Sequence, residues 1–456
     1  MKEEIVTEED IVSEVKREKI ERVHFQFVDI VGNLKSVSVP TKTKENLENF
    51  KEYVENGLGF DGSSVEGFVR IAESDLVLKP HISTFRIFPW RINEIKEARF
   101  LCEVLRPGGF PFEGDPIYVL KNCEKRLEEK LGKGTTPNFA SEIEFFLFEM
   151  KDDIAATPLK TDRYGYFDYA PLHKTTLALN KAIDYMEKLG VNVVKEHHEV
   201  SQGQYEINYK HKPALEAAID FINYKLCVKV ASYENELFAS FMPKPIYGVN
   251  GSGAHTHQSI MRNGENLFFD EKDSYHLSDL ARHFLAGQLK CVKEIVGITN
   301  PTVNSYKRLV VGYEAPVYIC WGSRNRSALI RKPEYFPGKE KETRLEARWP
   351  DPSMNPFLGY AVMLEAGLYG IEKKLEPPQP VEEDVYHFDD SKLKKFYIET
   401  LPQSLGEAME LTRKSKIVEK ALGRFVKEKV YEILKAQWDS YRKQVHPWEL
   451  EKYLAL

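Results

Sequence analysis

The sequence predicts an α+β protein in which a small α+β region precedes a larger region built from an antiparallel sheet backed by helices. Short segments with alternating apolar and polar residues recur along the chain between stretches with helical spacing. A run dense in proline and glycine at residues 107–116 separates the two regions, which we place at 1–110 and 111–456. The 456 residues, of which 42% are hydrophobic, suffice for the cores of two or three domains.

The first region begins with a short helix and a strand. Residues from Thr7 to Asp10 have the pattern of a capping box, which satisfies free backbone NH groups at a helix start. From Arg22 onward the residues alternate as in a half-buried strand. The segment from Asp61 to Asp75 is loop-like, and its residues alone predict a turn with a hydrogen-bonded aspartate.

The second region begins with a long helix at 119–131. Further helices are predicted at 176–189 and 213–234, with strands between them that carry polar motifs. A stiff, proline-rich turn at 376–380 precedes a C-terminal helix whose apolar stripe would form a core or subunit contact. The stripe consists of Phe425, Val430, Ile433, Leu434, Trp438 and Tyr441.

Charged and imidazole side chains occur in pairs two residues apart. Glu142 and Glu144 lie in the aromatic-rich segment 141–148, which is typical of a buried strand. Residues two apart on a strand point to the same face, so both groups would enter one cavity. A buried glutamate must be paired, bound to a metal or protonated. The same spacing recurs at two further places, in His255 with His257 and in Glu346 with Arg348.

Five glutamates and His255 form a donor set that suits Mg²⁺ or Mn²⁺, because these ions prefer oxygen ligands. The glutamates are Glu142, Glu144, Glu199, Glu206 and Glu346. No cysteine lies in these motifs, which argues against structural zinc. The chain lacks a Walker A loop, a complete dinucleotide-binding turn at Gly251–Gly253 and an HExxH motif. We expect His197, His198 and His283 to be structural, and His255 and His257, beside the glycines, to be functional.

Arginines are concentrated between residues 304 and 348. They are Arg308, Arg324, Arg326, Arg331, Arg344 and Arg348. Guanidinium groups bind carboxylate and phosphate oxygens bidentately and stay charged. Any one of them alone would more often form a surface salt bridge. Together with the metal-type acids they indicate a site for an anionic substrate and a transferring phosphoryl group.

The composition excludes several classes of protein. The formal net charge is −6 and the basic residues are dispersed, so we expect no nucleic acid partner. The five cysteines are odd in number and lack CxxC spacing, which favours reduced thiols. The first ten residues lack the apolar stretch of a signal peptide, and no apolar run approaches the ~20 residues of a membrane span. We therefore expect a cytoplasmic protein.

These segments, in this order, resemble type I glutamine synthetase over nearly the whole chain, and the short stretch between Phe148 and Tyr166 resembles its alpha subdivision. The matching segments are 28–32, 60–75, 142–148, 165–168, 197–206, 241–245, 250–259, 300–331 and 344–356. The resemblance implies a β-grasp amino-terminal domain over 1–110 and a catalytic domain over 111–456. It also implies a homododecamer of two stacked hexameric rings, with each active site between neighbouring subunits.

The resemblance also implies roles for individual residues, with ATP as co-substrate and two or three Mg²⁺ or Mn²⁺ ions in each site. One metal would bind Glu144, Glu199 and Glu206, and a second would bind Glu142, His255 and Glu346. Glutamate would be held by Asn250, Gly251, Arg308 and Arg348, and ATP by His257, Ser259, Arg331, Lys341 and Arg344. Arg326 would stabilise the transferring phosphoryl group, and Glu314 would lie on a mobile flap. Asp61, supported by Ser64, would reach across from a neighbouring subunit and bind ammonium with Glu199 and Tyr166.

The implied reaction, in nitrogen assimilation, joins ammonia to the γ-carboxylate of L-glutamate through γ-glutamyl phosphate, giving L-glutamine, ADP and phosphate. One alternative is a γ-glutamyl ligase for organic amines or polyamines, but Asp61, Glu199 and Glu314 are retained, which favours ammonia. A second alternative is a catalytically silent nitrogen sensor, with a nitrogen-regulatory protein as partner. The intact metal ligands argue against it.

Some positions depart from the pattern of the resembled family. Leu179 and Asn180 stand where paired arginines are common, so activation by 2-oxoglutarate through that pair is not expected. Arg70 matches an arginine linked to feedback by glutamine in the alpha subdivision, so this control is retained as an expectation. Tyr386 lies near the position of an adenylylated tyrosine, but its sequence context differs and we do not expect modification there.

Overall fold

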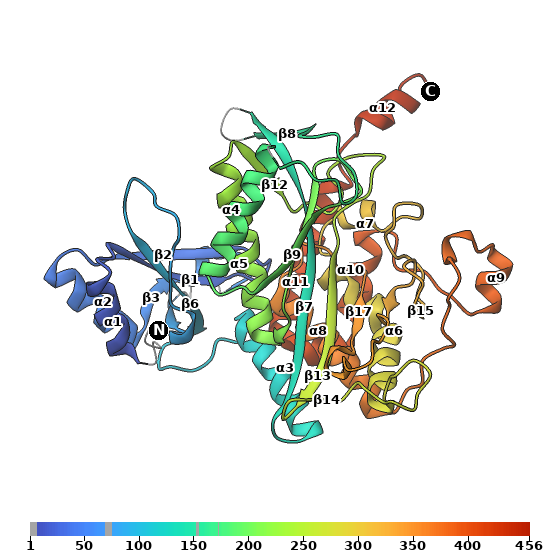
Figure 1. The fold of residues 1–456 in the computed structure, drawn as a ribbon, viewed down its shortest axis with the longest axis horizontal. Helices are drawn as coiled ribbons and strands as arrows, with labels where there is room; N and C mark the ends of the chain where they lie inside the picture. Colours follow the sequence, from blue (N-terminus) through green and yellow to red (C-terminus); the bar gives the residue numbers. More distant parts are fainter. Residues whose placement is uncertain (1–6, 69–74, 152–154, 172) are drawn as a thin grey trace.

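A computed structural model of the chain describes residues 7–68, 75–151, 155–171 and 173–456 (Figure 1). The smaller region forms a six-stranded sheet covered by two helices, α1 Glu8–Arg17 and α2 Lys44–Asn56. The strands run in the order β2-β1-β6-β4-β3, and β5 pairs with β6. They are β1 Arg22–Val28, β2 Leu34–Pro40, β3 Leu58–Asp61, β4 Asp75–Pro80, β5 Arg86–Ile87 and β6 Glu97–Leu105.

The central β1–β6 pair is parallel, whereas the other described pairs of this sheet are antiparallel. The capping box predicted at Thr7 is confirmed, because Thr7 and Asp10 bond each other's backbone NH groups at the start of α1. The strand predicted from Arg22 is confirmed as β1. Phe25, Phe50 and Phe100 join strands and helix in the core.

The larger region contains an eleven-stranded sheet within the described residues, with a main path of β15-β16-β17-β13-β7-β10-β9. The strands are β7 Thr135–Lys151, β8 Ala155–Lys160, β9 Val193–His198, β10 Gln204–Tyr209, β11 Lys212–Pro213, β12 Leu237–Ser240, β13 Ala254–Arg262, β14 Glu265–Asn266, β15 Trp321–Gly322, β16 Ile330–Arg331 and β17 Leu345–Ala347. The β15–β16 pair is parallel and the other described pairs are antiparallel, as the sequence predicts.

The larger region also contains helices, most of which lie against the sheet, whereas α9 and α12 project away from it and have no buried residues (Figure 1). The helices are α3 Pro116–Leu131, α4 Lys174–Lys188, α5 Ala214–Tyr233, α6 Asp279–Thr299, α7 Ser305–Arg308, α8 Pro356–Lys373, α9 Asp390–Lys395, α10 Leu405–Lys414, α11 Lys416–Tyr441 and α12 Pro447–Tyr453. Helix α8 is mostly apolar and packs closely on α6. A Cβ atom on Gly370 would lie 2.0 Å from the His283 carbonyl oxygen, so only glycine permits this approach.

The predicted helices are present, with shifted ends. The first helix of the larger region begins at Pro116 rather than at residue 119, because Asp115 caps it and proline suits the first turn. The C-terminal stripe lies on α11, which is interrupted by non-helical backbone at Gly423. Val430 and Leu434 of this stripe are buried in the core.

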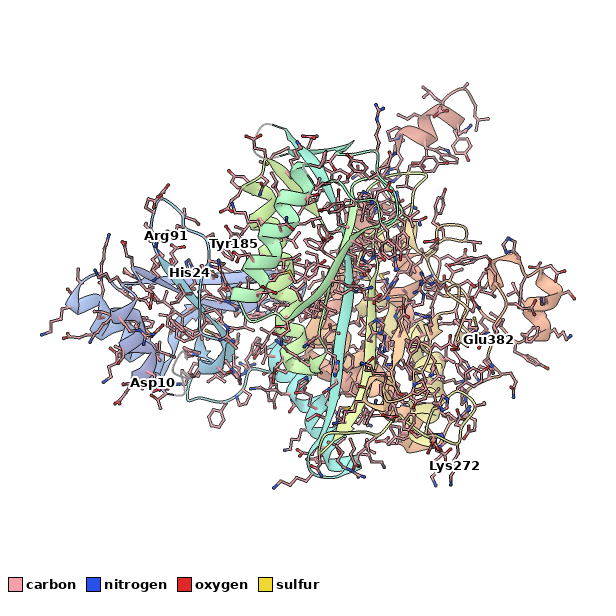
Figure 2. The ribbon with its side chains drawn as sticks, viewed as in Figure 1. Asp10, His24, Arg91, Tyr185, Lys272 and Glu382 are labelled. Carbon is pink, nitrogen blue, oxygen red and sulfur yellow. The ribbon has the colours of Figure 1, made fainter. Side chains whose placement is uncertain are left out.

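Side chains join the two regions. The ring of Trp90 lies 5.3 Å from that of Tyr185, which Figure 2 labels on α4. Arg99 of β6 donates a hydrogen bond to Asn223 on α5. Arg99 is fully buried at this junction. Among the described residues, no helix combines the length and apolarity needed to cross a membrane.

Candidate active site

Acidic and histidine side chains form one row across five neighbouring strands of the larger sheet. The row includes the predicted metal ligands Glu142, Glu144, Glu206, His255 and Glu346, and Glu199 directly follows β9. His255 on β13 is the register partner of Glu142 on β7. Glu206 on β10 faces Glu144 on β7 from the other side. Register partners on antiparallel strands share a face, and residues two apart on a strand do so as well. The row continues to His197 on β9, opposite Glu206, and to Glu346 on β17, opposite His257.

At one end of the row, Glu142, His255 and Glu346 each offer a ligand atom within 4.8 Å of the others. His255 Nδ1 lies 3.7 Å from Glu142 Oε2 and 3.9 Å from Glu346 Oε1. Two arginines form ion pairs with Glu346: Arg348 Nη1 lies 2.6 Å from Glu346 Oε1, and Arg331 Nη1 lies 3.0 Å from Glu346 Oε2. The ligand atoms at this end suit a divalent cation, and the two arginines also contact one of its carboxylates, that of Glu346.

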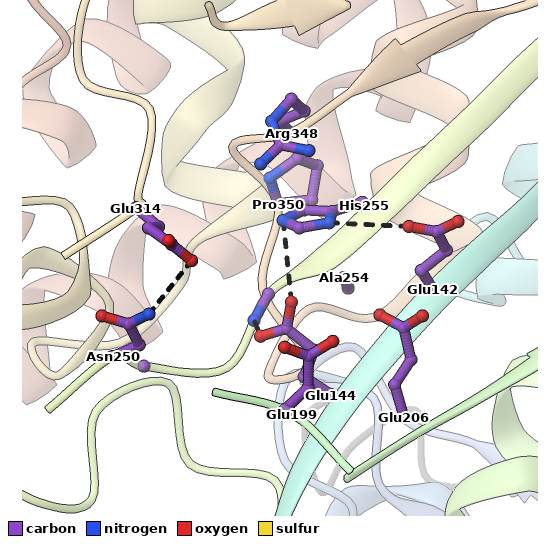
Figure 3. Close-up of polar contacts among 12 residues, drawn as sticks. Glu142, Glu144, Glu199, Glu206, Asn250, Ala254, His255, Glu314, Arg348 and Pro350 are labelled. Atoms are coloured by element: carbon purple, nitrogen blue, oxygen red, sulfur yellow. Dashed lines mark hydrogen bonds and ion pairs between the residues drawn. The ribbon is translucent and has the colours of Figure 1, made fainter. Parts of the chain in front are cut away.

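At the other end, His197, Glu199 and Glu206 form a second group with ligand atoms within 4.8 Å of one another. His197 Nε2 lies 3.0 Å from Glu199 Oε1 and 3.9 Å from Glu206 Oε1. Glu144 lies beside this group but is not one of the three residues whose ligand atoms all lie within 4.8 Å of one another. Its Oε2 atom accepts hydrogen bonds from Gly253 N at 2.8 Å and Gln204 Nε2 at 3.1 Å. Figure 3 shows Glu144 beside Glu199.

The crowding of carboxylates gives this site unusual proton affinities. Burial raises the pKa of Glu206 well above its ordinary value, and the carboxylates of Glu142 and Glu144 raise it further. Burial also raises the pKa of Glu144. At the other end burial acts in the same direction, but Arg348 and His257 outweigh it and lower the pKa of Glu346 to about 2. Divalent cations would relieve the repulsion around Glu206, so this donor set fits them.

A small pocket adjoins the row and contains the residues expected to hold an amino-acid substrate. Its cavity of about 40 Å³ is lined by Glu144, Glu199, Gln204, Asn250, Gly251, His255, Arg308, Tyr313, Glu314, Ala315 and Arg348. Asn250 Nδ2 donates to Glu314 Oε2 at 3.1 Å across its mouth (Figure 3). Glu314 has a φ of 55°, a conformation uncommon for residues other than glycine, asparagine and aspartate.

The buried guanidinium of Arg308 is placed by backbone carbonyls. It donates to Trp349 O at 2.8 Å and to Arg348 O at 3.1 Å, and it forms no ion pair with a described carboxylate. A Cβ atom on Gly253 would lie 2.6 Å from Arg308 Nη2 and 2.8 Å from His255 Nε2. The glycine therefore lets the strand start pass between these two functional side chains.

The residues expected to bind ATP line two adjoining cavities. His257, Ser259, Lys341 and Arg344 line a cavity of about 540 Å³ together with Glu142. Arg344 Nε donates to His257 Nδ1 at 3.1 Å. Arg331 lines the next cavity, of about 350 Å³, in which Arg344 also takes part. These volumes are in the range of small-molecule sites.

Three other candidate residues, Asp61, Ser64 and Arg326, line none of the cavities described beside the row. Asp61 and Ser64 are exposed in the smaller region, where Asp61 Oδ1 accepts from Ser63 N at 2.8 Å. Arg326 is also exposed and forms no ion pair with a described residue. Tyr166 is 45% exposed, and its ring lies 5.7 Å from that of His197, close to the second donor group. Arg70 lies outside the described residues.

Sequence reasoning missed some contributors to this site. His197 was expected to be structural, whereas its ring meets two of the acids; its position opposite Glu206 depends on strand register. Gln204 connects Glu144 to the Gly251 carbonyl oxygen, and Asn208 donates to Glu206 Oε1 at 2.9 Å. Gln204, Glu206 and Asn208 alternate along one strand, and this spacing could have predicted that their side chains share a face.

A larger cavity, of about 640 Å³, lies elsewhere, between the two regions. Its lining carries basic and acidic groups together, including Arg86, Arg99, Lys212, Glu124 and Asp220. It lacks the clustered donors of the row. Geometry and donor chemistry therefore favour the smaller cavities beside the row as the reaction site.

Comparison with known proteins gives a consistent result along the chain. A family model described as glutamine synthetase, beta-Grasp domain matches residues 19–107, and one described as glutamine synthetase, catalytic domain matches residues 113–453. The chain is 45% identical to the glutamine synthetase of Clostridium saccharobutylicum over 451 residues, covering 98% of each. It is 43% identical to that of Methanosarcina mazei, covering 99% of this chain and 98% of the relative.

Solved structures agree with these matches. GmaS in complex with ADP aligns with a TM-score of 0.86 at 29% identity, covering 98% of this chain and 100% of that one. Plasmodium falciparum glutamine synthetase aligns with a TM-score of 0.85 at 22% identity, covering 98% of this chain and 99% of the other. At that identity the second likeness supports the fold alone. The expected fold, with a β-grasp domain followed by a larger sheet and helices, is confirmed.

Proposed function

The chain belongs to the glutamine synthetase family, and from this premise we propose how its residues form L-glutamine from L-glutamate, ammonia and ATP. It is an ATP-dependent ligase, and the relatives that support this activity match nearly its whole length. The observation that carries the residue-level proposal is the row of acids and histidines on five strands, with an arginine-lined pocket and larger cavities beside it. This arrangement suits phosphoryl transfer to a carboxylate.

The two ends of the row would hold divalent cations, Mg²⁺ or Mn²⁺. The donors are Glu142, His255 and Glu346 at one end, and Glu199, Glu206 and the adjacent Glu144 at the other, with His197 within reach. When bound, such ions neutralise charge on the phosphates and on the substrate carboxylate. The family uses ATP and divalent metals, and we propose two or three ions per site.

In the first step, Arg308 and Arg348 hold the carboxylates of glutamate, with the Asn250–Gly251 backbone beside them. The γ-carboxylate oxygen attacks the γ-phosphorus of ATP, the bond to the β,γ-bridging oxygen breaks, and ADP leaves with that electron pair. His257, Ser259, Arg331, Lys341 and Arg344 place the nucleotide, and Arg326 stabilises the moving phosphoryl group. Catalysis here is mainly positioning and charge stabilisation.

In the second step, ammonium binds between Glu199, Tyr166 and the Asp61 carboxylate of a neighbouring subunit, with Ser64 beside it. Asp61 accepts a proton from ammonium, and ammonia then attacks the γ-carbonyl carbon. Phosphate leaves with the electrons of the C–O bond and takes up the proton that the new amide nitrogen loses. The exposed position of Asp61, far from its own row, supports contribution to another subunit's site. A neutral nucleophile is required because ammonium has no free electron pair.

Glu314 would act as a gate over the glutamate pocket. The cavity beneath it, about 40 Å³, has room for one or two water molecules, so glutamate enters only when the loop moves. Closing the loop afterwards keeps water from the acyl phosphate. The contact of Glu314 with Asn250 and its unusual backbone support this role.

The finer assignments of this proposal concern classification and assembly. We place the chain in the alpha subdivision of type I, with a domain boundary at residue 110. We propose a cytoplasmic dodecamer of two hexameric rings, a nitrogen-regulatory protein as a candidate partner, and feedback by glutamine through Arg70. Mass photometry at nanomolar concentration tests the assembly, since a hexamer or dimer would contradict the two-ring proposal.

Substrate choice is tested by phosphate release from ATP with Mg²⁺ and glutamate. Ammonium is supplied in one reaction, and methylamine, ethylamine or putrescine in others, with each product identified by mass. We expect glutamine from ammonium with kcat/KM at least about 100-fold above any amine, or about 2.7 kcal/mol of discrimination. A preference for an amine would replace ammonia as the proposed substrate.

A further inference from the structure

Asp162 is a fully buried carboxylate that lies between β8 and α4, outside the row of proposed metal ligands. Its side chain has no exposed surface. The Oδ1 atom accepts from Gly203 N at 2.9 Å and from Tyr164 N at 3.2 Å, and it lies 3.2 Å from His198 Nε2. The Oδ2 atom accepts from the Tyr205 hydroxyl at 2.6 Å. One carboxylate thus receives hydrogen bonds from three separate segments.

These segments carry the residues proposed to bind ammonium. His198 immediately precedes Glu199, and its Nδ1 atom donates to the Glu199 carbonyl oxygen at 2.6 Å. The His198 carbonyl oxygen accepts from Phe167 N at 3.1 Å, and the Phe167 ring stacks on Tyr166 with centroids 4.0 Å apart. A single chain of contacts therefore runs from Asp162 to both Glu199 and Tyr166.

The same carboxylate fixes the turn between β9 and β10. Gly203 in this turn has a φ of 74°, and a Cβ atom there would lie 3.1 Å from the Leu147 carbonyl oxygen. The next residue, Gln204, donates to Glu144 and to the Gly251 carbonyl oxygen. The Tyr205 hydroxyl also bonds Thr175 Oγ1 at 2.8 Å, which anchors the network to α4.

A neutral or apolar side chain could not replace these contacts. Two carboxylate oxygens can accept every one of these bonds without donating any, whereas an amide must turn a donor toward one partner. Burying a charge is costly unless it is fully hydrogen-bonded, and here it faces His198 and three further donors. Asp162 itself contacts no proposed ligand atom of the metal or nucleotide, so its effect on the reaction is indirect.

We propose that Asp162 is a positioning residue for the ammonium pocket, which fixes Glu199 and Tyr166 relative to each other through His198, Gly203 and Tyr205. This inference rests on the proposed assignment of that pocket. Loosening the network displaces two of the groups that surround ammonium, whereas the nucleotide cavity is lined by none of the residues that contact Asp162. Recognition of ammonium is then weakened more than recognition of ATP.

The test compares Asp162→Asn with Tyr205→Phe and with Asp115→Asn, at saturating Mg²⁺ and glutamate. Asp115 is a buried aspartate that caps α3 away from the site, so it controls for loss of a buried, hydrogen-bonded carboxyl group. We expect the KM for ammonium to rise roughly tenfold in Asp162→Asn and about threefold in Tyr205→Phe. The KM for ATP should stay within twofold in all three, and Asp115→Asn should keep the ammonium KM of the wild type.

Hydroxylamine, an uncharged nucleophile, separates positioning of a cation pocket from general damage. We expect Asp162→Asn to lose roughly tenfold in kcat/KM with ammonium and less than threefold with hydroxylamine. Equal losses with both nucleophiles, or an ammonium KM unchanged in a folded Asp162→Asn protein, would overturn the inference. If Asp162→Asn does not fold, the same comparison on Tyr205→Phe decides.

Two further variants separate this inference from the proposed function. Tyr166→Phe and Glu199→Gln change the pocket directly and should each raise the KM for ammonium. If both leave it unchanged, the pocket assignment fails and the inference fails with it. If both raise it while Asp162→Asn does not, the pocket stands and only the positioning role is refuted.

Discussion

Replacing Glu206 by glutamine should stabilise the cation-free protein and weaken its stabilisation by Mg²⁺. Glu206 is 4% exposed and lies in a row of acids, where burial and the carboxylates of Glu142 and Glu144 raise its pKa well above the ordinary value. In the absence of a cation its charge is therefore unfavourable. With a cation bound, the same carboxylate becomes an attractive partner.

The magnitudes follow from these opposing terms. Two unit charges about 4 Å apart repel by about 4 kcal/mol at an effective dielectric constant of 20, and protonation limits the cost to a part of this, on the order of 1–3 kcal/mol. An unfolding entropy of roughly 1 kcal/mol/K for a chain of this length converts that into about 1–3 °C. Wild type should gain about 3 °C at Mg²⁺ one hundredfold above its Kd.

The assay is thermal unfolding at pH 8 in EDTA and in a Mg²⁺ series. In EDTA, the Tm of Glu206→Gln should exceed that of wild type by about 1–3 °C, and its Mg²⁺-induced shift should be less than half as large. Glu196→Gln is the matched control, because Glu196 is an exposed acid on β9 whose register partner is Ile207. Equal Mg²⁺-induced shifts in wild type and Glu206→Gln would refute the reasoning.

Three further predictions concern substrate recognition, proton transfer and pH. Arg308→Lys should raise the KM for glutamate by at least about tenfold and leave the KM for ATP within twofold, because lysine lacks the forked guanidinium that the backbone carbonyls hold. Steady-state kinetics with each substrate varied measure both constants. Parallel rises in the two KM values would contradict the prediction. Asp61→Asn should reduce ammonia-dependent turnover at least about 100-fold. Mixed oligomers of Asp61→Asn with the inactive Glu346→Gln variant should regain activity if Asp61 acts in the site of a neighbouring subunit. If no activity returns, Asp61 acts in the site of its own subunit. Burial raises the pKa of Glu124 from its ordinary 4.5 to about 7, so the folded protein binds this proton more tightly than the unfolded chain, and stability falls by on the order of 3 kcal/mol as pH rises through that window. The Tm of Glu124→Gln relative to wild type should therefore increase between pH 5 and pH 8, and a constant difference would show that Glu124 does not titrate there.

The strand and helix pattern of this fold could be predicted from local sequence. Side-chain alternation at Glu142 and Glu144 correctly indicated a strand face, and the capping residues at Thr7 marked a helix start. The first residue of α3 was placed three positions late, because the apolar periodicity begins after the Asp115 cap and Pro116. Periodicity describes the buried face of a helix and says little about its capped end.

The candidate site could be predicted only as far as its motif residues. The register that sets His197 opposite Glu206 joins segments nine residues apart through a turn, and the sequence alone does not determine that pairing. The contacts of Asp162 with Tyr164, His198, Gly203 and Tyr205 link residues across the turn and the loop. An isolated aspartate in a loop has the composition of an ordinary turn, so nothing local distinguishes it.

The most direct test of the central claim is the path of oxygen during turnover. Glutamate carrying ¹⁸O in both γ-carboxylate positions is incubated with ATP, Mg²⁺ and ¹⁵N-ammonium. The masses of the glutamine and phosphate formed are then measured by mass spectrometry. Formation of γ-glutamyl phosphate predicts that each glutamine carries one ¹⁵N and one ¹⁸O, while each released phosphate carries the other ¹⁸O. Phosphate without ¹⁸O would mean that water, rather than the glutamate carboxylate, receives the phosphoryl group, and would contradict the account.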